Sequence, residues 1–111
     1  MTNKIKKQKQ NASGLLIEFK GFLSFFILHE LSKKSHCGDD LALMIGKRKA
    51  EKLTPGTIYP TLKKLRRLKL IKYKKDGRKK MYHLTDEGKK ELKKLYKTLK
   101  LYFKGVKSKF N

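Results

Sequence analysis

The sequence predicts a mainly helical α+β domain that contains one two-strand β-hairpin, and three observations support this prediction. Apolar residues recur at spacings of three and four along 54–68 and 87–110, as they do on one face of a helix. Residues 12–31 are apolar on most sides, which indicates a helix buried on two faces. Two runs with a period of two flank Asp76-Gly77, a strong hairpin signal because the turn needs positive φ.

The segment 54–68 is expected to form a helix with one buried side and one basic side. Thr54 suits the N-cap because its hydroxyl can accept from a free amide of the first turn, and Pro55 suits the first helical position. Pro60 removes one helical hydrogen bond and should bend or loosen the first turns. The predicted buried stripe comprises Ile58, Leu62, Leu65 and Leu68, and the opposite side carries Gly56, Pro60, Lys63 and Arg67.

A hairpin and a second helix follow this helix. Ile71 and Tyr73 alternate with lysines before the turn, and Tyr82 and Leu84 continue the period of two after it. Thr85 is expected to cap the next helix, whose first turn is acidic and so complements the helix dipole. The predicted hairpin tip is basic, with Arg78, Lys79 and Lys80 in a row and Lys74 and Lys75 on the approach.

The charge of the chain points to a polyanionic partner. Lys and Arg total 31 against 9 acidic residues in 111, a formal net charge of +22, and double-stranded DNA is the expected partner. Thr57, Tyr59, Thr61 and Lys63 occupy the first helical turns that usually reach base edges in a major groove. Arg78, at the tip, is the candidate for a narrow minor groove. The expected phosphate contacts are Lys63, Lys64, Lys74, Lys75, Lys79 and Lys80, and Arg67 is a further expected DNA-binding residue.

The two ends of the chain predict a dimer. An apolar stripe continues along 87–110, beyond the end of the hairpin domain, and a two-fold partner is the simplest way to cover it. Folding back onto its own domain is the alternative. The expected dimer interface comprises Leu16, Phe19, Phe22, Leu92, Leu95, Leu99, Phe103 and Val106.

The order helix, hairpin, helix resembles the second half of a winged helix-turn-helix, and its residues resemble the PadR family of transcriptional regulators. The resemblance is specific in Pro55-Gly56-Thr57-Ile58-Tyr59-Pro60 and in Tyr82-His83-Leu84-Thr85-Asp86-Glu87-Gly88, and it covers roughly residues 14–90. The family usually has a tyrosine where this chain has Asp39, which we expect to be the N-cap of a short helix over 38–45. Residues 46–53 would connect that helix to the next.

The resemblance implies a DNA-binding regulator, most often a repressor, that can respond to a small-molecule effector held near the dimer interface. The expected parts are a basic disordered arm over 1–11, a winged helix-turn-helix domain over 12–88 and a C-terminal dimerisation helix over 89–111. An architectural protein that coats DNA with little sequence preference, in a prokaryote or a virus of one, remains the alternative. The abundance of lysine relative to arginine favours it, since lysine acts as a point charge.

Other functions find little support in the sequence. No phosphate loop, nucleophile elbow or paired carboxylate appears, so an enzyme is not expected. His29, His36, His83 and Cys37 lack a zinc-ligand spacing, and no metal or other cofactor is expected. Cys37 is the single cysteine, which fits a reducing compartment. Charged residues interrupt the apolar segment 12–31, which argues against a membrane span, and we expect a cytoplasmic, nucleoid-associated protein.

Overall fold

The computed structural model describes residues 19–49 and 53–106. The predicted fold class is confirmed: helices dominate, and one small antiparallel sheet accompanies them. The predicted arm over 1–11 and the predicted interface residue Leu16 lie outside the described residues. The elements in chain order are α2 (Phe19–Leu31), β1 (His36–Cys37), α3 (Gly38–Lys49), α4 (Pro55–Arg67), β2 (Ile71–Asp76), β3 (Lys79–Leu84) and α5 (Asp86–Tyr102).

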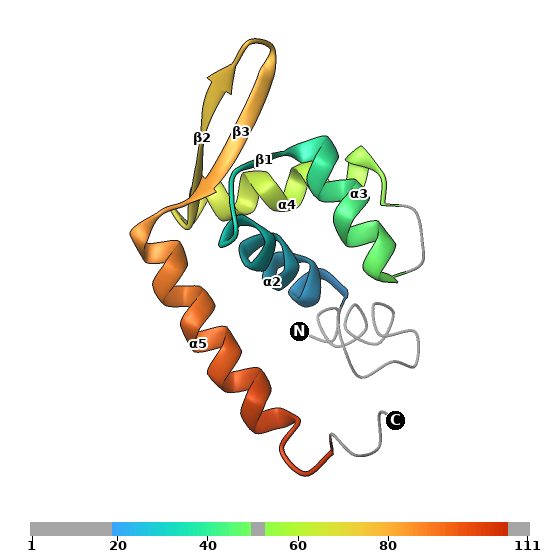
Figure 1. The fold of residues 1–111 in the computed structure, drawn as a ribbon, viewed down its shortest axis with the longest axis vertical. Coiled ribbons are helices and arrows are strands. Elements are labelled where there is room, and N and C mark those ends of the chain that lie inside the picture. The colour runs from blue at the N-terminus through green and yellow to red at the C-terminus, as the bar shows by residue number, and fades with distance from the viewer. Residues whose placement is uncertain (1–18, 50–52, 107–111) are drawn as a thin grey trace, which may run out of the picture.

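The sheet has three strands in the order β1-β3-β2, one more strand than the sequence predicted. The short strand β1 pairs His36 with Tyr82, so the chain entering α3 is fixed directly to the hairpin. We call the β2–β3 hairpin the wing. Figure 1 shows the wing projecting from one end of the helical body, while α5 leads away from the wing toward the opposite end.

One hydrophobic core joins the helices of the described residues to the base of the wing. Its members come from α2, α3, α4, the wing and the first turns of α5. Burial of these side chains is the main favourable contribution to folding, at about 25 cal/mol per Å² of apolar surface. The core residues are Leu23, Ile27, Leu28, Leu31, Leu41, Ile45, Ile58, Leu62, Leu65, Ile71, Tyr82, Leu84 and Leu92.

Helix α4 follows the predicted pattern except at its ends. Ile58, Leu62 and Leu65 are buried as expected, but Leu68 is 56% exposed because the helix ends at Arg67 and Leu68 forms its C-cap. Thr54 is the N-cap and Pro55 begins the helix, as predicted, but the predicted capping bond was wrong, because the Thr54 side chain makes no bond to a backbone amide. Its carbonyl accepts from the amides of Thr57 and Ile58 instead. The helix continues through Pro60, which lies within Pro55–Arg67.

The start of α5 is anchored to the corner between α4 and β2. The Thr85 hydroxyl donates to the Lys69 carbonyl at 2.7 Å and accepts from the Gly88 amide at 3.0 Å, which confirms the predicted cap. The Thr85 amide donates to the Leu70 carbonyl at 3.1 Å. Gly88 is required by the close approach of this corner, since an added Cβ would lie 2.0 Å from the Leu70 carbonyl oxygen.

Helix α3 is longer than predicted, because basic residues assigned to a connection are part of it. Arg48 donates from Nη2 to Glu30 Oε2 at 2.7 Å and from Nε to the same oxygen at 3.1 Å. Its guanidinium also lies over the Phe26 ring, 5.3 Å from the centroid. Burial raises the pKa of Glu30, but hydrogen bonding to Arg48 and the charge of Lys33 outweigh it, so the pKa is lowered. The pair therefore joins the last turn of α3 to α2.

Gly88→Ala is expected to destabilise the fold by about 1–3 kcal/mol or more, because the new methyl group collides with backbone rather than with a movable side chain. Gly56→Ala is the matched control, since the nearest atom to an added Cβ there is 3.8 Å away. That helical substitution should stabilise by up to about 1 kcal/mol. Urea unfolding of both variants measures the difference. Equal stability of the two variants would contradict the close approach at Gly88.

Arg48→Ala should destabilise the fold by about 1.5–3 kcal/mol, because among the described residues it leaves the buried Glu30 carboxylate with Lys33, at 3.6 Å, as its one ion-pair partner. The lower end is expected, since the Arg48 side chain is 39% exposed. Because the folded pKa of Glu30 is lowered, its stabilisation is complete above the unfolded value of about 4.3 and is lost as pH falls through the folded pKa.

The measurement is denaturant unfolding of the wild type and Arg48→Ala at neutral and acid pH, with Lys47→Ala as the control on the same helix turn. The stability difference should be largest at neutral pH and should shrink in acid. A difference that is independent of pH, or an equal loss in Lys47→Ala, would disprove this role of the ion pair.

Candidate nucleic-acid interface

Helix α4 exposes four basic residues to solvent, three on the side away from its buried stripe and Arg66 at the edge beside the wing. Lys63, Lys64, Arg66 and Arg67 are all exposed, and we call these four residues the basic face of α4. Thr57 and Thr61 are half-buried, and the Thr61 hydroxyl donates to the Thr57 carbonyl at 3.2 Å. The Thr57 hydroxyl lies 3.3 Å from the hydroxyl of Thr54. The structure thus brings the predicted lysines and arginine of α4 together, while both predicted threonine hydroxyls already have partners within the chain.

The strand register divides the lysines of the wing between its two faces. Lys75 pairs with Lys80 and Tyr73 with Tyr82, so these residues share the face that continues into the core. Lys74 pairs with Met81, and Lys79 with Asp76, on the opposite face. The predicted contacts Lys74, Lys75, Lys79 and Lys80 therefore do not form one plane; they flank the hairpin on both sides.

The wing turn differs by one residue from the prediction. The two-residue loop is Gly77-Arg78 rather than Asp76-Gly77, because Asp76 still pairs with Lys79 in the ladder. Gly77 has a φ of +66°, the conformation that glycine tolerates best. Arg78 consequently lies at the very tip of the wing and is exposed, where the sequence placed it.

An aromatic ring joins the basic face of α4 to the wing. The Arg66 guanidinium lies 4.8 Å from the centroid of Tyr73, and Lys80 Nζ lies 4.9 Å from the same centroid. We call Arg66, Tyr73 and Lys80 the Tyr73 junction. A cation over an aromatic face gains about 0.5–1 kcal/mol at exposed sites. The junction thus holds two cations from different elements beside each other, and the sequence prediction had not included Arg66 among the site residues.

Tyr59 is held at the start of α4 by two contacts with the start of α3. Its hydroxyl donates to Asp39 Oδ1 at 3.0 Å, and its ring lies over Gly38, where an added Cβ would be 2.6 Å from Tyr59 Cε1. Burial, and then the hydrogen bond and charge of Asp39, raise the pKa of Tyr59 to about 12. The expectation that Asp39 is an N-cap was wrong, because α3 begins at Gly38 and Asp39 lies in its first turn.

A hollow of about 280 Å³ lies between the start of α3, the start of α4 and the wing tip. We call it the tip hollow. It brings Tyr59 and Asp39 together with the basic residues of the tip, although these segments are distant in sequence. The residues that line it are Cys37, Gly38, Asp39, Tyr59, Arg78, Lys79, Lys80 and Tyr82.

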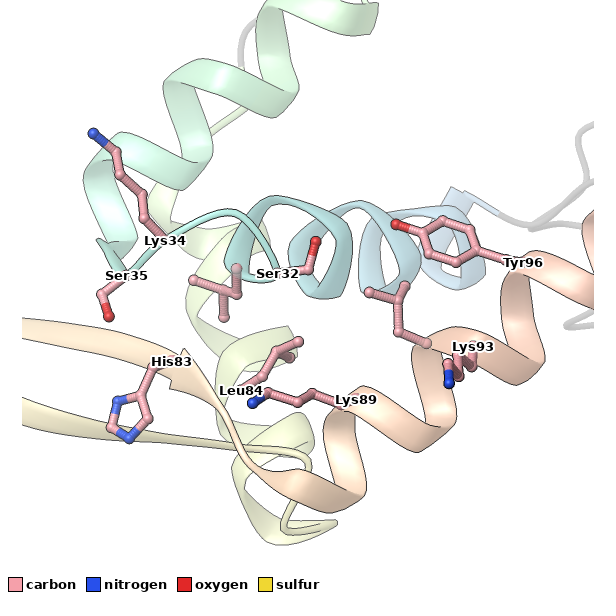
Figure 2. A pocket seen from close by; sticks show the side chains of 10 residues that line it. Ser32, Lys34, Ser35, His83, Leu84, Lys89, Lys93 and Tyr96 are labelled. Atoms are coloured by element: carbon pink, nitrogen blue, oxygen red, sulfur yellow. The ribbon is translucent and has the colours of Figure 1, made fainter.

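A second hollow, of about 470 Å³, lies at the base of the wing between α2 and α5. Its polar lining comes from the turn after α2, from β3 and from α5. Figure 2 shows that the amino groups of Lys34, Lys89 and Lys93 point in different directions rather than toward one centre. Burial, and then the charge of Lys34, lower the pKa of His36 nearby. The charges of this hollow therefore do not define one ligand position.

The predicted dimer residues differ in how far their own chain buries them. Leu92 is 4% exposed and belongs to the core of its own chain, and Leu95 packs against that core, so the prediction was wrong for Leu92. Phe22 and Leu99 are half-buried, and Phe103 and Val106 are exposed. Phe19 begins α2, but the structure does not describe its side chain.

An apolar hollow of about 610 Å³ lies along the end of α5. Leu99, Leu101 and Phe103 line it, and Leu101 and Tyr102 are largely exposed. Tyr96, at the edge of this region, is fixed to α2: its hydroxyl lies 2.6 Å from His29 Nδ1, and its ring meets Phe25 edge-on. Burial, and then the charge of Lys33, lower the pKa of His29.

Several solved structures of known proteins share the fold of this chain. A PadR-like regulator from Bacillus cereus is 29% identical and superimposes with a TM-score of 0.71 over 83% of this chain and 94% of that chain. A PadR family regulator from Clostridium difficile is 29% identical, with a TM-score of 0.66 over 80% and 97%. A PadR-like transcription factor from Bacteroides fragilis, 24% identical, shares the fold with a TM-score of 0.71 over 95% and 97%.

No curated protein sequence matches the chain. The family profile described as "Transcriptional regulator PadR-like family" matches residues 27–94, more than half of the chain. The matched range runs from α2 to the first half of α5 and so includes the basic face of α4, the wing and the Tyr73 junction. The chain therefore belongs to the PadR-like family of transcriptional regulators, which are DNA-binding proteins and not enzymes.

Proposed function

We propose that this chain is a sequence-specific regulator of transcription, acting as a repressor, that places α4 in the major groove and the wing on the adjacent backbone or minor groove. The observation that carries the proposal is the Tyr73 junction. It fixes the basic face of α4 beside the wing, so two cationic elements meet the same duplex together. Family membership supports DNA binding in general.

In this arrangement most lysines bind phosphates and a few residues read sequence. Lys63, Lys64 and Arg67 lie on the basic face of α4, where they would contact the phosphates that border the major groove. The wing lysines on both faces of the hairpin suit a wing that lies between two phosphate strands, since each face then meets one of them. Arg78 at the tip is our candidate for a narrow A/T-rich minor groove.

We infer a two-fold dimer through the end of α5. The apolar hollow along Leu99, Leu101 and Phe103, together with exposed Tyr102, offers a surface that a second copy could cover. Two recognition helices would then fit half-sites about one helical turn apart. No helix in the described ranges is both long and apolar enough to cross a membrane. Action on chromosomal DNA would place the protein inside the cell.

One observation favours a second function, an architectural DNA-binding protein. Of the 31 basic residues only four are arginine, and lysine binds phosphate without the forked geometry that reads guanine. The ratio of specific to non-specific affinity distinguishes the two functions. A regulator should show at least ~10³, whereas an architectural protein should show little preference for any duplex.

The binding of duplex DNA should weaken steeply with salt, with a log–log slope of about −0.9 for each phosphate contacted. Lys63→Gln should reduce the magnitude of that slope by about 0.9 and lower affinity for every sequence alike. Fluorescence anisotropy of a labelled duplex across a salt series measures both. Lys97→Gln is the matched control, because Lys97 is an exposed lysine on α5, away from α4 and the wing. A flat salt response, or equal changes in both variants, would remove the proposed footprint.

Leu99→Lys should convert the dimer to a monomer, because it places a charge in the apolar hollow at the end of α5. Sedimentation of the wild type should give about twice the chain mass of 13.0 kDa. Salt above physiological strength is needed, since two subunits of +22 repel each other. Thr98→Lys, exposed on the same helix, is the control and should stay dimeric. A monomeric wild type, or dissociation caused by the control, would exclude this interface.

A further inference from the structure

Asp39 is an acidic side chain within an otherwise basic surface. It lines the tip hollow together with Arg78, Lys79 and Lys80 of the wing. Yet no lysine or arginine nitrogen within the described ranges lies at ion-pair distance from its carboxylate, which accepts instead from the Tyr59 hydroxyl at 3.0 Å. The chain has 9 acidic residues against 31 basic ones, and the hydrogen-bond donor to this carboxylate is nevertheless the neutral hydroxyl of Tyr59.

The hydrogen bond determines what Tyr59 can offer to another molecule. A phenol hydroxyl has one proton to donate and two lone pairs that accept. While that proton is directed at Asp39, Tyr59 can act toward a ligand only as an acceptor. The pKa of Tyr59, raised to about 12 by burial and by Asp39, keeps the proton in place at physiological pH. Gly38 permits this position of the ring, since the ring occupies the space that a Cβ at residue 38 would take.

DNA presents two kinds of partner to such a hydroxyl. Phosphate oxygens only accept hydrogen bonds, and they are also repelled by a carboxylate that lies 3.0 Å from the Tyr59 oxygen. In the major groove, the amino groups of adenine and cytosine donate, whereas the exposed edge atoms of guanine and the carbonyl of thymine accept. Tyr59 is 40% exposed in the first turns of α4, the part of a recognition helix that usually faces base edges.

We propose that Asp39 is a positioning residue for sequence recognition: by taking the only proton of Tyr59, it makes Tyr59 an acceptor that selects adenine or cytosine at one position of each half-site. This inference rests on the proposed function, in which α4 enters the major groove. It gives a role to the departure of Asp39 from the tyrosine that the family usually carries. It also makes the expected contact of Tyr59 with base edges more specific, namely with base amino groups.

Selection of bound duplexes from a random library, with the full chain, tests the proposal. The wild type should enrich adenine or cytosine on one strand at one position of each half-site. Tyr59→Phe should lose that preference at that position alone, because the ring remains on Gly38 while the acceptor is gone. Asp39→Ala frees the Tyr59 proton while the lone pairs remain, so the hydroxyl can then also donate, and the preference at the same position should relax to admit guanine and thymine.

A double variant separates positioning from a general effect of charge. Because Asp39 acts through Tyr59, adding Asp39→Ala to Tyr59→Phe should not change the base preference further. Asp40→Ala is the matched control: Asp40 is the next residue of the same helix turn, exposed and acidic. It should raise affinity for all duplexes through its charge and leave the preferred bases unchanged.

The proposal is overturned if Tyr59→Phe or Asp39→Ala selects the same bases as the wild type, or if Asp40→Ala shifts the preference as Asp39→Ala does. Binding of the wild type without any base preference would also overturn it, while salt-dependent duplex binding would leave the proposed contact surface standing. Absence of duplex binding by the wild type would instead refute the proposed function itself. Thermal melting of each variant verifies that the helices remain folded.

Discussion

The rest of the structure depends on the packing of α4 against the wing. This packing holds two positively charged elements side by side against their electrostatic repulsion. Ile58, Leu62 and Leu65 on α4 share one core with residues at the base of the wing. Beside that core, the Tyr73 ring attracts both Arg66 and Lys80, which offsets part of the repulsion between their like charges. In the proposed function, a duplex bound by both elements would neutralise the electrostatic repulsion that remains between them in the free protein.

The few acidic residues of the chain make different kinds of contact. Glu30 is buried and binds Arg48 and Lys33, which joins α3 to α2. Asp86 and Glu87 lie in the first turn of α5, where the helix dipole favours them. Asp39 differs from these, since its partner is the neutral hydroxyl of Tyr59. This difference is the reason to assign Asp39 to recognition rather than to stability.

Sequence alone predicted the elements whose signal is local and periodic. The stripe Ile58, Leu62 and Leu65, the cap at Thr85 and the basic tip at Arg78 all follow from spacing and turn chemistry, and the structure has them. Strand β1 gave no signal because it has two residues and exists only through its pairing with β3. Leu68 was misassigned because periodicity does not reveal where a helix ends, and α4 ends at Arg67.

The contacts that organise the site could not be predicted in the same way. Arg66 and Tyr73 meet because α4 docks on the wing, and Asp39 and Tyr59, which are 20 positions apart in the sequence, meet across two helices. Neither pair leaves a pattern in the chain. The period of two along a strand explains why the wing lysines are divided between two faces. Which of these lysines lie on the face that continues into the core depends on the burial of Tyr82 and Leu84.

The most direct measurement of the central claim is hydroxyl-radical footprinting of the protein on a selected duplex. If α4 and the wing form one surface, the protected sugars should flank a major groove and continue without interruption into the adjoining minor groove. Arg78→Ala should then lose only the minor-groove part, and Lys63→Gln only contacts beside the major groove. Two separate protected regions, or a footprint that neither variant alters, would contradict a shared surface of helix and wing.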